Sequence, residues 1–371
     1  MTISRRTLLQ RLSTGAAATV AVPWLPESSA AGPPGRPIRL DRNGNAYGPS
    51  EQAMAALRRA GTSVNRYADF EMDALRRKIA DRHRVTPEQV VLGCGSGEVL
   101  RMAVDAFVGR PKTLIAAVPT CDAIGNAARR VGAEVVAIPL KKDYSHDLDA
   151  MLACSDAATG LIYICNPNNP TGTLTLRREL EAFIRRLPAT TSVLIDEAYH
   201  HYVVESSDYA SFIDRAIDDD RIIVSRSFSK IYGLAGVRVG YAIAAPPTSR
   251  LLAAHRLPEA VNVIAATTAA AALDDAEHLR MSASRNTDDR QEFFNQANAR
   301  MLRWIDSQTN FVMLHAGRPA VEVIEHFKKH EILVGPPVPA FEKSIRVSLG
   351  TPGEMREFWR VWDLMPGGHL M

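Results

Sequence analysis

A lysine, an arginine and a serine near the middle of the chain have the types and spacing for covalent chemistry beside a phosphate. Lys230 ends a Ser-Phe-Ser-Lys segment that follows an apolar run expected to be a buried strand. Burial and a neighbouring cation favour a neutral lysine, which is a nucleophile that forms Schiff bases. Arg238 follows eight residues later, after a glycine-containing turn, and could bind a phosphate together with the Ser227 hydroxyl. Taken alone, a lysine among serines is more often a solvated loop residue.

Three further polar residues follow expected strands. Asp196 ends the apolar run 193–195, and a carboxylate there can hold a pyridine nitrogen protonated so that the ring accepts electrons. Tyr199 and Asn169 could both hydrogen-bond a phenolic oxygen of such a ring. Asn169 lies in the turn 166–172, which two prolines and a glycine stiffen. The alternative for these residues is a helix cap, a core tyrosine and a stiff loop.

The glycine-rich segment 93–97 stands between an expected strand and an expected helix. Its glycines permit close approach of a ligand to the backbone, and the exposed amides of a helix start favour a phosphate. The glycine spacing matches neither a dinucleotide-binding fingerprint nor a P-loop. A tight strand-to-helix turn without a ligand explains the segment equally well.

The elements that would position these residues alternate between short apolar runs and amphipathic stretches from about residue 50 to 250. Continuous apolar strands separated by helices indicate an α/β fold with a mostly parallel sheet covered on both faces. The expected strands are 90–92, 113–118, 134–138, 160–165, 193–195, 221–224 and 239–243. The later part, with helical segments at 272–302 and 320–330 and strands at 311–314 and 344–349, indicates a smaller α+β domain.

Composition fits a soluble enzyme and excludes several other classes. The 371 residues are 46% hydrophobic and 23% charged, with a net charge of +3, so neither nucleic acid nor a membrane surface is an expected partner. The four cysteines lack the paired spacing of a zinc site or a disulfide framework. His200 and His201 have no suitably spaced third ligand, so no metal is expected.

The first thirty residues have the layout of a twin-arginine export signal. A basic segment with Arg5 and Arg6 precedes the weakly apolar stretch 15–22 and the small residues 28–31. The apolar stretch is too short and interrupted for a membrane span. We expect delivery by the twin-arginine machinery to the periplasm, or another space outside the cytoplasm, with a cytoplasmic protein as the alternative.

From residues 40–50 to residues 345–352, the ordered set Asn169, Asp196, Tyr199, Lys230 and Arg238 resembles the fold type I, class I/II aminotransferases. The histidinol-phosphate aminotransferase-like branch is the most similar. The resemblance implies a pyridoxal 5′-phosphate (PLP) enzyme whose large domain has a mostly parallel seven-stranded sheet and whose smaller domain is α+β. It divides the chain into a signal at 1–30, an arm at 31–49, a large domain at 50–255 and a small domain at 256–371.

The same resemblance implies a role for each matching residue. Lys230 would bind the cofactor as a Schiff base and shuttle a proton, with Asp196 on the ring nitrogen and Tyr199 on the phenolic oxygen. Arg346 would grip the substrate carboxylate through two parallel hydrogen bonds. Tyr67 would reach the phosphate in a neighbouring subunit, so a homodimer with shared sites is implied. The remaining cofactor-binding residues would be Gly95, Ser96, Gly97, Cys121, Asn169, Ser227 and Arg238.

Three departures from the branch concern the substrate. Cys121 stands where an aromatic ring usually stacks on the cofactor. Gly44 and Ala46 replace a glutamate and a proline, so Asn45 and Tyr47 would line a changed, substrate-binding entrance. The segment 333–337 lacks the arginine expected for a phosphorylated substrate, which disfavours histidinol phosphate.

These features predict ping-pong transfer of an amino group between a 2-oxo acid and an amino acid or a carboxylate-bearing amine metabolite. The altered residue at Cys121 leaves open a decarboxylase, a lyase or a racemase of the same fold. Histidinol-phosphate transamination itself and a non-catalytic binding scaffold are the further alternatives.

Overall fold

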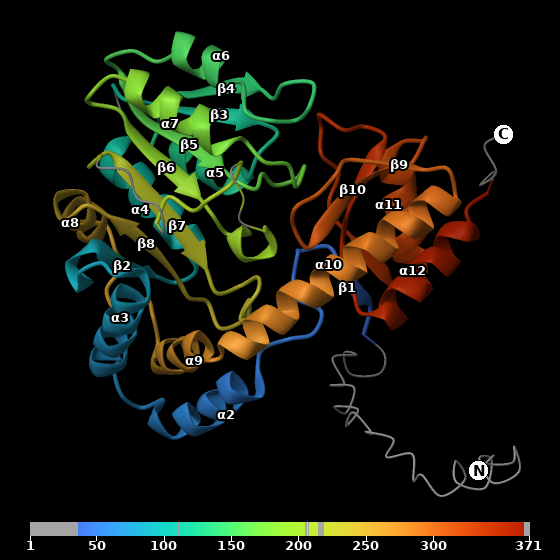
Figure 1. Ribbon diagram of the computed structural model, residues 1–371, viewed down its shortest axis with the longest axis horizontal. Helices are drawn as coiled ribbons and strands as arrows, with labels where there is room; N and C mark the ends of the chain where they lie inside the picture. The colour runs from blue at the N-terminus through green and yellow to red at the C-terminus, as the bar shows by residue number, and fades with distance from the viewer. Residues whose placement is uncertain (1–35, 110, 205, 207, 214–218, 367–371) are drawn as a thin grey trace, which may run out of the picture. The chain divides into compact units, whose positions relative to one another are not determined.

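Seven strands pair in the order β2-β8-β7-β6-β5-β3-β4 and form the sheet on which the polar residues are placed (Figure 1). The computed structural model describes residues 36–366 apart from 110, 205, 207 and 214–218, so the predicted export signal lies outside the described residues. The strands are β2 (Val90–Gly93), β3 (Thr113–Val118), β4 (Val135–Pro139), β5 (Thr159–Cys165), β6 (Ser192–Asp196), β7 (Ile222–Ser227) and β8 (Gly240–Ala244).

The sheet is mostly parallel, as predicted. Neighbouring strands from β4 through β3, β5 and β6 to β7 are parallel, whereas β8 is antiparallel to both β7 and β2. The seven predicted apolar runs correspond to these seven strands within a few residues at each end. Their continuous apolar character follows from burial on both faces.

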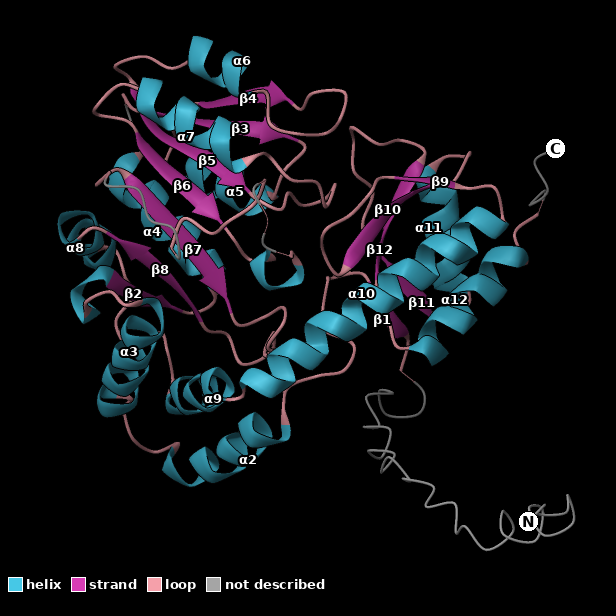
Figure 2. Cartoon of the chain, viewed as in Figure 1, coloured by secondary structure: helices cyan, strands magenta, loops and turns pink. Residues whose placement is uncertain are grey.

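Helices cover both faces of the sheet (Figure 2). Alternate strand residues point to opposite faces, so Ile162 and Ile164 belong to one apolar core and Leu161 and Tyr163 to the other. The first core includes residues of α3 (Asp69–His83), α6 (Leu148–Ala153), α7 (Arg177–Arg186) and α9 (Val263–Asp274). The second includes residues of α4 (Ser96–Phe107), α5 (Asp122–Arg130) and α8 (Pro246–Ala254).

A separate apolar core lies in the later part of the chain. An antiparallel sheet of order β12-β10-β9 and a parallel pair β1-β11 pack there with aromatic side chains; Phe327 stacks on Phe358 with ring centroids 4.6 Å apart. The strands are β1 (Ile38–Leu40), β9 (Arg303–Trp304), β10 (Phe311–His315), β11 (Ile332–Val334) and β12 (Ser344–Ser348). The helices are α11 (Ala320–Lys329) and α12 (Pro352–Asp363).

The change from one core to the other falls within a single long helix. The helix α10 (Ala276–Ala299) contributes Leu279 to the core of the large sheet, and Phe293 and Ala297 to the later core. The helix α9 also belongs to the large-sheet core, with its closest packing against α2 (Glu51–Ala60) and α3. This change of core therefore does not coincide with the boundary predicted at residue 256.

Three short 3₁₀ helices complete the described elements: η1 (Gly61–Ser63), η2 (Pro87–Gln89) and η3 (His200–Tyr202). Among the described residues, no helix has both the length and the apolar character needed to cross a membrane.

Candidate active site

The carboxyl ends of β5, β6 and β7 meet at one edge of the sheet. The parallel register sets Cys165 beside Asp196, and Asp196 beside Ser225. The turn after β5 carries Asn169, and the loop after β7 carries Lys230. The topology thus brings together three of the predicted residues at the edge where ligand sites of such sheets form.

The Lys230 amine is buried near this edge of the sheet. Its Nζ donates to the carbonyl oxygens of Asn43 at 3.0 Å and Arg42 at 3.2 Å, and lies 5.4 Å from the centroid of the Tyr199 ring. Burial, followed by the nearby Arg346 guanidinium, lowers the pKa of Lys230 to about 8. About a tenth of the amine is therefore neutral and nucleophilic at pH 7, far more than for an ordinary lysine.

Asp196 is a buried carboxylate with both oxygens hydrogen-bonded. Its Oδ2 accepts from the Tyr163 hydroxyl at 2.9 Å, and its Oδ1 accepts from the backbone N–H of Ala198 at 3.2 Å. Burial raises the pKa of Asp196 to about 6, against the opposing effect of these hydrogen bonds. The carboxylate remains ionised at neutral pH and can pair with a protonated ring nitrogen.

Tyr199 is held by the arm that precedes α2. Its hydroxyl oxygen accepts from Asn43 Nδ2 at 2.9 Å, and its ring meets Phe311 edge-on with centroids 5.1 Å apart. Burial raises the pKa of Tyr199, so the hydroxyl stays protonated and keeps a hydrogen to donate. Asn43 is fixed in turn by Ser348, whose Oγ accepts from the Asn43 N–H at 2.8 Å.

The glycine-rich segment and Arg238 lie together at one corner of the site. Gly95 has φ +75°, and a Cβ added there would overlap the Arg238 guanidinium, so the arginine lies directly on this glycine. Arg238 Nη1 donates to Ser229 Oγ at 3.3 Å, and Ser227 Oγ accepts from the Ser229 N–H at 3.0 Å. The helix α4 begins at Ser96, directly after Gly95, and the free amides of a helix start suit a phosphate.

Arg346 reaches the site from β12. Its Nη1 donates to Asn169 Oδ1 at 2.7 Å and its Nη2 to the Asp41 carbonyl at 2.9 Å. Its Nε is buried and has no hydrogen-bond partner among the described residues. Gly335 packs against it, because a Cβ added at Gly335 would lie 2.9 Å from the Arg346 carbonyl oxygen and 3.1 Å from Nε.

An open pocket of about 560 Å³ is lined by some of these residues. The polar residues that line it include Lys230, Tyr199, Asn169 and Arg346, and the apolar ones are Leu333, Val334 and Pro336. The side chain of Arg42 is at the rim, 83% exposed, with its Nε 3.8 Å from Asp41. The pocket can therefore accommodate a carboxylate beside Arg346 and an apolar group beside β11.

Four predicted residues lie apart from this group or at its margin. Tyr67 is 72% exposed. Asn45 donates to the Ile231 carbonyl at 2.9 Å, and the Tyr47 hydroxyl donates to Asp289 Oδ2 at 2.8 Å; neither is among the described residues that line the pocket. Cys121 caps α5, and burial followed by the nearby Asp196 raises the pKa of its thiol. The roles predicted for these four stay predictions.

Comparison with known proteins identifies the family. The family model for aminotransferases of class I and II matches residues 36–361. The chain is a class I and II aminotransferase. It is 34% identical to a histidinol-phosphate aminotransferase of Symbiobacterium thermophilum over 86% of this chain and 88% of that protein. For the Bacillus subtilis strain 168 enzyme of the same name, identity is 35% over 87% of this chain and 90% of the relative.

Solved structures show the same fold. A candidate histidinol-phosphate aminotransferase of Erwinia carotovora atroseptica aligns with a TM-score of 0.83 and 31% identity over 87% of this chain and 94% of that one. The Sinorhizobium meliloti histidinol-phosphate aminotransferase, solved with pyridoxal-5′-phosphate, aligns with a TM-score of 0.82 and 24% identity over 98% and 96% of the two chains. The predicted fold type I architecture is confirmed.

This aminotransferase is a PLP-dependent enzyme that transfers amino groups, as predicted. The residues present fit that cofactor. The Lys230 amine has a lowered pKa, the buried Asp196 carboxylate accepts hydrogen bonds from the Tyr163 hydroxyl and the Ala198 N–H, and Arg238 and Gly95 form a corner that suits a phosphate.

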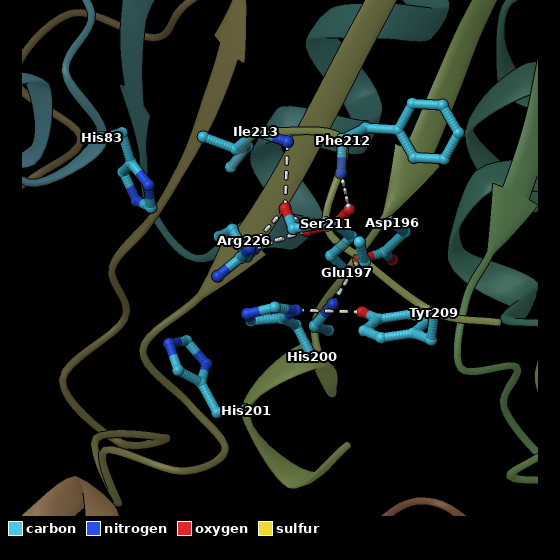
Figure 3. A network of polar contacts seen from close by, with 12 residues as sticks. His83, Asp196, Glu197, His200, His201, Tyr209, Ser211, Phe212, Ile213 and Arg226 are labelled. Atoms are coloured by element: carbon cyan, nitrogen blue, oxygen red, sulfur yellow. Dashed lines mark hydrogen bonds and ion pairs between the residues drawn. The ribbon is translucent and has the colours of Figure 1, made fainter. Parts of the chain in front are cut away.

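Several groups of the site were missed from the sequence. Asn43 and Tyr163 contact Tyr199 and Asp196 across 156 and 33 residues of chain, and spacing alone does not reveal such contacts. A third missed feature is a buried ion pair (Figure 3), in which Arg226 Nη2 lies 2.8 Å from Glu197 Oε2 with both side chains 2% exposed. Here a signal existed, because Glu197 directly follows Asp196 and Arg226 directly precedes Ser227.

Figure 3 also shows His200 and His201 beside the ion pair. His200 Nδ1 lies 3.0 Å from the Tyr209 hydroxyl, and the two imidazole rings are 5.1 Å apart. Within the part of the chain that the structure describes, no group of three or more His, Cys, Asp or Glu side chains could hold a metal ion.

The pKa of Lys230 gives a first prediction. In cofactor-free protein, labelling of Lys230 by an amine-reactive reagent should rise with a midpoint near pH 8, because only the neutral amine reacts. Arg346→Gln should raise the midpoint, since it removes a neighbouring cation. Labelling is quantified by mass spectrometry of the digested protein across pH.

Arg42→Gln is the matched control, because its exposed side chain lines the same pocket and its charge is screened by solvent. It should leave the midpoint unchanged. Lys230→Ala should abolish labelling there and, after reconstitution with PLP, the visible absorption of lysine-bound cofactor. A midpoint near 10.5, or one insensitive to Arg346→Gln, would contradict this account.

Proposed function

We propose that this aminotransferase takes its amino group from an amino acid with an uncharged, largely apolar side chain, and that histidinol phosphate is not its substrate. Gly335 carries the proposal. With its Cα packed against Arg346, position 335 has no room for a side chain, let alone a phosphate-binding arginine. The relatives named as histidinol-phosphate aminotransferases support the reaction class but share only about a third of their residues with this chain.

Arg346 is the group that would bind the substrate carboxylate. Its Nη1 and Nη2 are oriented by Asn169 and the Asp41 carbonyl, so the guanidinium is held in place before the substrate arrives. A planar guanidinium can donate two parallel hydrogen bonds to a carboxylate, which a lysine ammonium cannot reproduce.

The wall beside β11 would receive the substrate side chain. Leu333, Val334 and Pro336 line it and carry no charge. A phosphate buried there without a cation would lose its hydration without compensation. Arg42 is the nearby cation at the rim, and its 83% exposed side chain offers a solvent-screened charge only.

When bound, PLP supplies an electron sink that makes the substrate α-hydrogen acidic. In the proposed assignment, Lys230 Nζ would accept that proton from the α-carbon and hold it for return, and its lowered pKa suits a general base. Asp196 holds the proton on the ring nitrogen, while Tyr199 and the Asn169 amide hold the phenolic oxygen. The phosphate is bound by Gly95, Ser96, Gly97, Ser227 and Arg238.

A donor screen tests the substrate class. Purified enzyme mixed with single amino donors, without acceptor, should release about one equivalent of 2-oxo acid from apolar amino acids. Histidinol phosphate should react with a kcat/KM lower by about 100-fold, the scale of losing a charge-assisted phosphate contact. A preference for histidinol phosphate would refute the proposal.

The screen includes a matched pair of arginine variants. Arg346→Lys should lower kcat/KM for apolar donors by about 10- to 100-fold, because the bidentate contact is lost. Arg42→Lys should stay within about twofold, since its exposed charge contributes little.

We also propose a homodimer with shared sites. Tyr67, at 72% exposed, lies among the exposed apolar side chains Val64 and Phe70, which a partner subunit would cover. In this arrangement Tyr67 reaches the cofactor phosphate of the partner, while Lys230 and Asp196 belong to one subunit.

Complementation tests the shared site. A 1:1 mixture of Lys230→Ala and Tyr67→Ala subunits should regain about a quarter of wild-type activity, because about half of the dimers formed are mixed and each mixed dimer carries one intact site. Mixed dimers of Lys230→Ala and Asp196→Asn should regain none, since both residues come from the same subunit. If the two mixtures recovered the same activity, Tyr67 would contribute to the site of its own subunit, and the shared site would be refuted.

Finally, we propose export by the twin-arginine route to the periplasm. The paired Arg5 and Arg6, the apolar stretch and the small residues that follow support it. The full-length protein should appear mature in the periplasmic fraction, and a variant with both Arg5→Lys and Arg6→Lys should stay in the cytoplasm. Fractionation with immunoblotting distinguishes the two, and an unchanged cytoplasmic location of both proteins would refute export.

A further inference from the structure

A buried tyrosine in the middle of the sheet supports the carboxylate of the site. Tyr163 lies in β5 with 0% exposure, and its hydroxyl donates to Asp196 Oδ2 at 2.9 Å. In the parallel pairing of β5 with β6, Tyr163 lies opposite Leu194, which is two residues before Asp196. Side chains two apart in a strand share a face, so the sheet itself directs the tyrosine toward the carboxylate.

Each of the two carboxylate oxygens of Asp196 accepts one hydrogen bond from the protein. Tyr163 donates to Oδ2, and the Ala198 N–H donates to Oδ1. Each oxygen retains acceptor capacity for one further hydrogen bond. Two donors attached to different parts of the chain fix the plane of the carboxylate, so it faces a ligand in one orientation.

The hydrogen bond also acts on the charge. Burial raises the pKa of Asp196, and the Tyr163 hydroxyl is the strongest of the groups that oppose this rise, ahead of the Ala198 amide and the Lys230 ammonium. Loss of the hydroxyl would move the pKa of Asp196 further up, toward neutral pH. A protonated Asp196 could no longer stabilise a proton on a ring nitrogen.

Tyr163 is suited to remain a donor. The hydroxyl adjoins the Cys121 and Cys165 thiols as well as Asp196, and burial raises the pKa of both thiols, which keeps them neutral. Burial and the Asp196 charge also raise the pKa of Tyr163. An ionised carboxylate is the strongest acceptor among these neighbours, so the hydroxyl hydrogen points to Asp196.

We propose that Tyr163 is a positioning residue for the cofactor, which acts through Asp196 by keeping that carboxylate ionised and oriented toward the ring nitrogen. The proposal rests on the role proposed above for Asp196. Tyr163 lies in a strand, six positions before Asn169, and its proposed effect on the cofactor is indirect.

The test compares two cofactors that differ at one atom. Full-length protein stripped of cofactor is titrated with PLP and with its 1-deaza analogue, in which carbon replaces the ring nitrogen. Tyr163→Phe should weaken PLP binding by about tenfold, as expected for one hydrogen bond to a charged group. Binding of the analogue should change by less than about twofold, because it has no ring nitrogen for Asp196 to hold.

Tyr241→Phe is the matched control. It removes the hydroxyl of another buried tyrosine, which lies 2.9 Å from His83 Nε2 rather than at Asp196. This variant should bind PLP and the analogue as the wild type does. If Tyr163→Phe weakened both ligands equally, or neither, Tyr163 would have a structural role only and the proposal would be overturned.

Asp196→Asn separates this proposal from the assignment on which it rests. If Asp196→Asn weakens PLP selectively while Tyr163→Phe does not, the role of Asp196 stands and that of Tyr163 fails. If Asp196→Asn shows no selectivity for PLP over the analogue, both roles are refuted.

Discussion

The ion pair between Arg226 and Glu197 constrains the edge of the sheet on which the site is built. Charges buried to this extent are tolerated only when each donor and acceptor is met. Ser211 Oγ donates to Glu197 Oε2 at 2.7 Å, and the Phe212 N–H donates to Oε1 at 2.9 Å. Because Glu197 directly follows Asp196 and Arg226 directly precedes Ser227, the pair fixes where β6 and β7 present their polar ends. Alternation along the strands then sends Asp196 to one face and the ion pair to the other.

Burial has opposite effects on the pKa values of the two titratable groups of the proposed mechanism. It lowers the pKa of Lys230 to about 8 and raises that of Asp196 to about 6. Neighbours then adjust each group separately: Arg346 lowers the pKa of the lysine further, and Tyr163 restrains the rise at the carboxylate. The lysine is hydrogen-bonded to backbone carbonyls and not to Asp196. A nucleophilic amine and an ionised carboxylate thus coexist near neutral pH.

The sequence predicted the seven strands and the residues at their ends because both depend on local pattern. Apolar runs bounded by turns identify buried strands, and a polar residue after such a run lies at the sheet edge wherever the chain goes next. Asn43, Tyr163 and the packing of Gly335 could not be predicted in this way, since each depends on which distant segment becomes a neighbour. Tyr47 illustrates the limit: its hydroxyl is bonded to Asp289 of α10, a contact 242 residues away in the chain.

Under the proposed function, selectivity against a phosphorylated substrate would depend on backbone packing more than on a single missing charge. Gly335 donates its N–H to the Arg346 carbonyl at 2.8 Å, which holds β11 against β12 and leaves no space for a side chain at 335. Arg346 in turn is fixed by Asn169 on the turn after β5 and by the Asp41 carbonyl. An arginine introduced at 335 would have to displace Arg346, and with it the contact to Asn169. Restoring a phosphate site would therefore require coordinated changes in three segments, because the group that would bind the substrate carboxylate and the wall that would exclude a phosphate share the same packing.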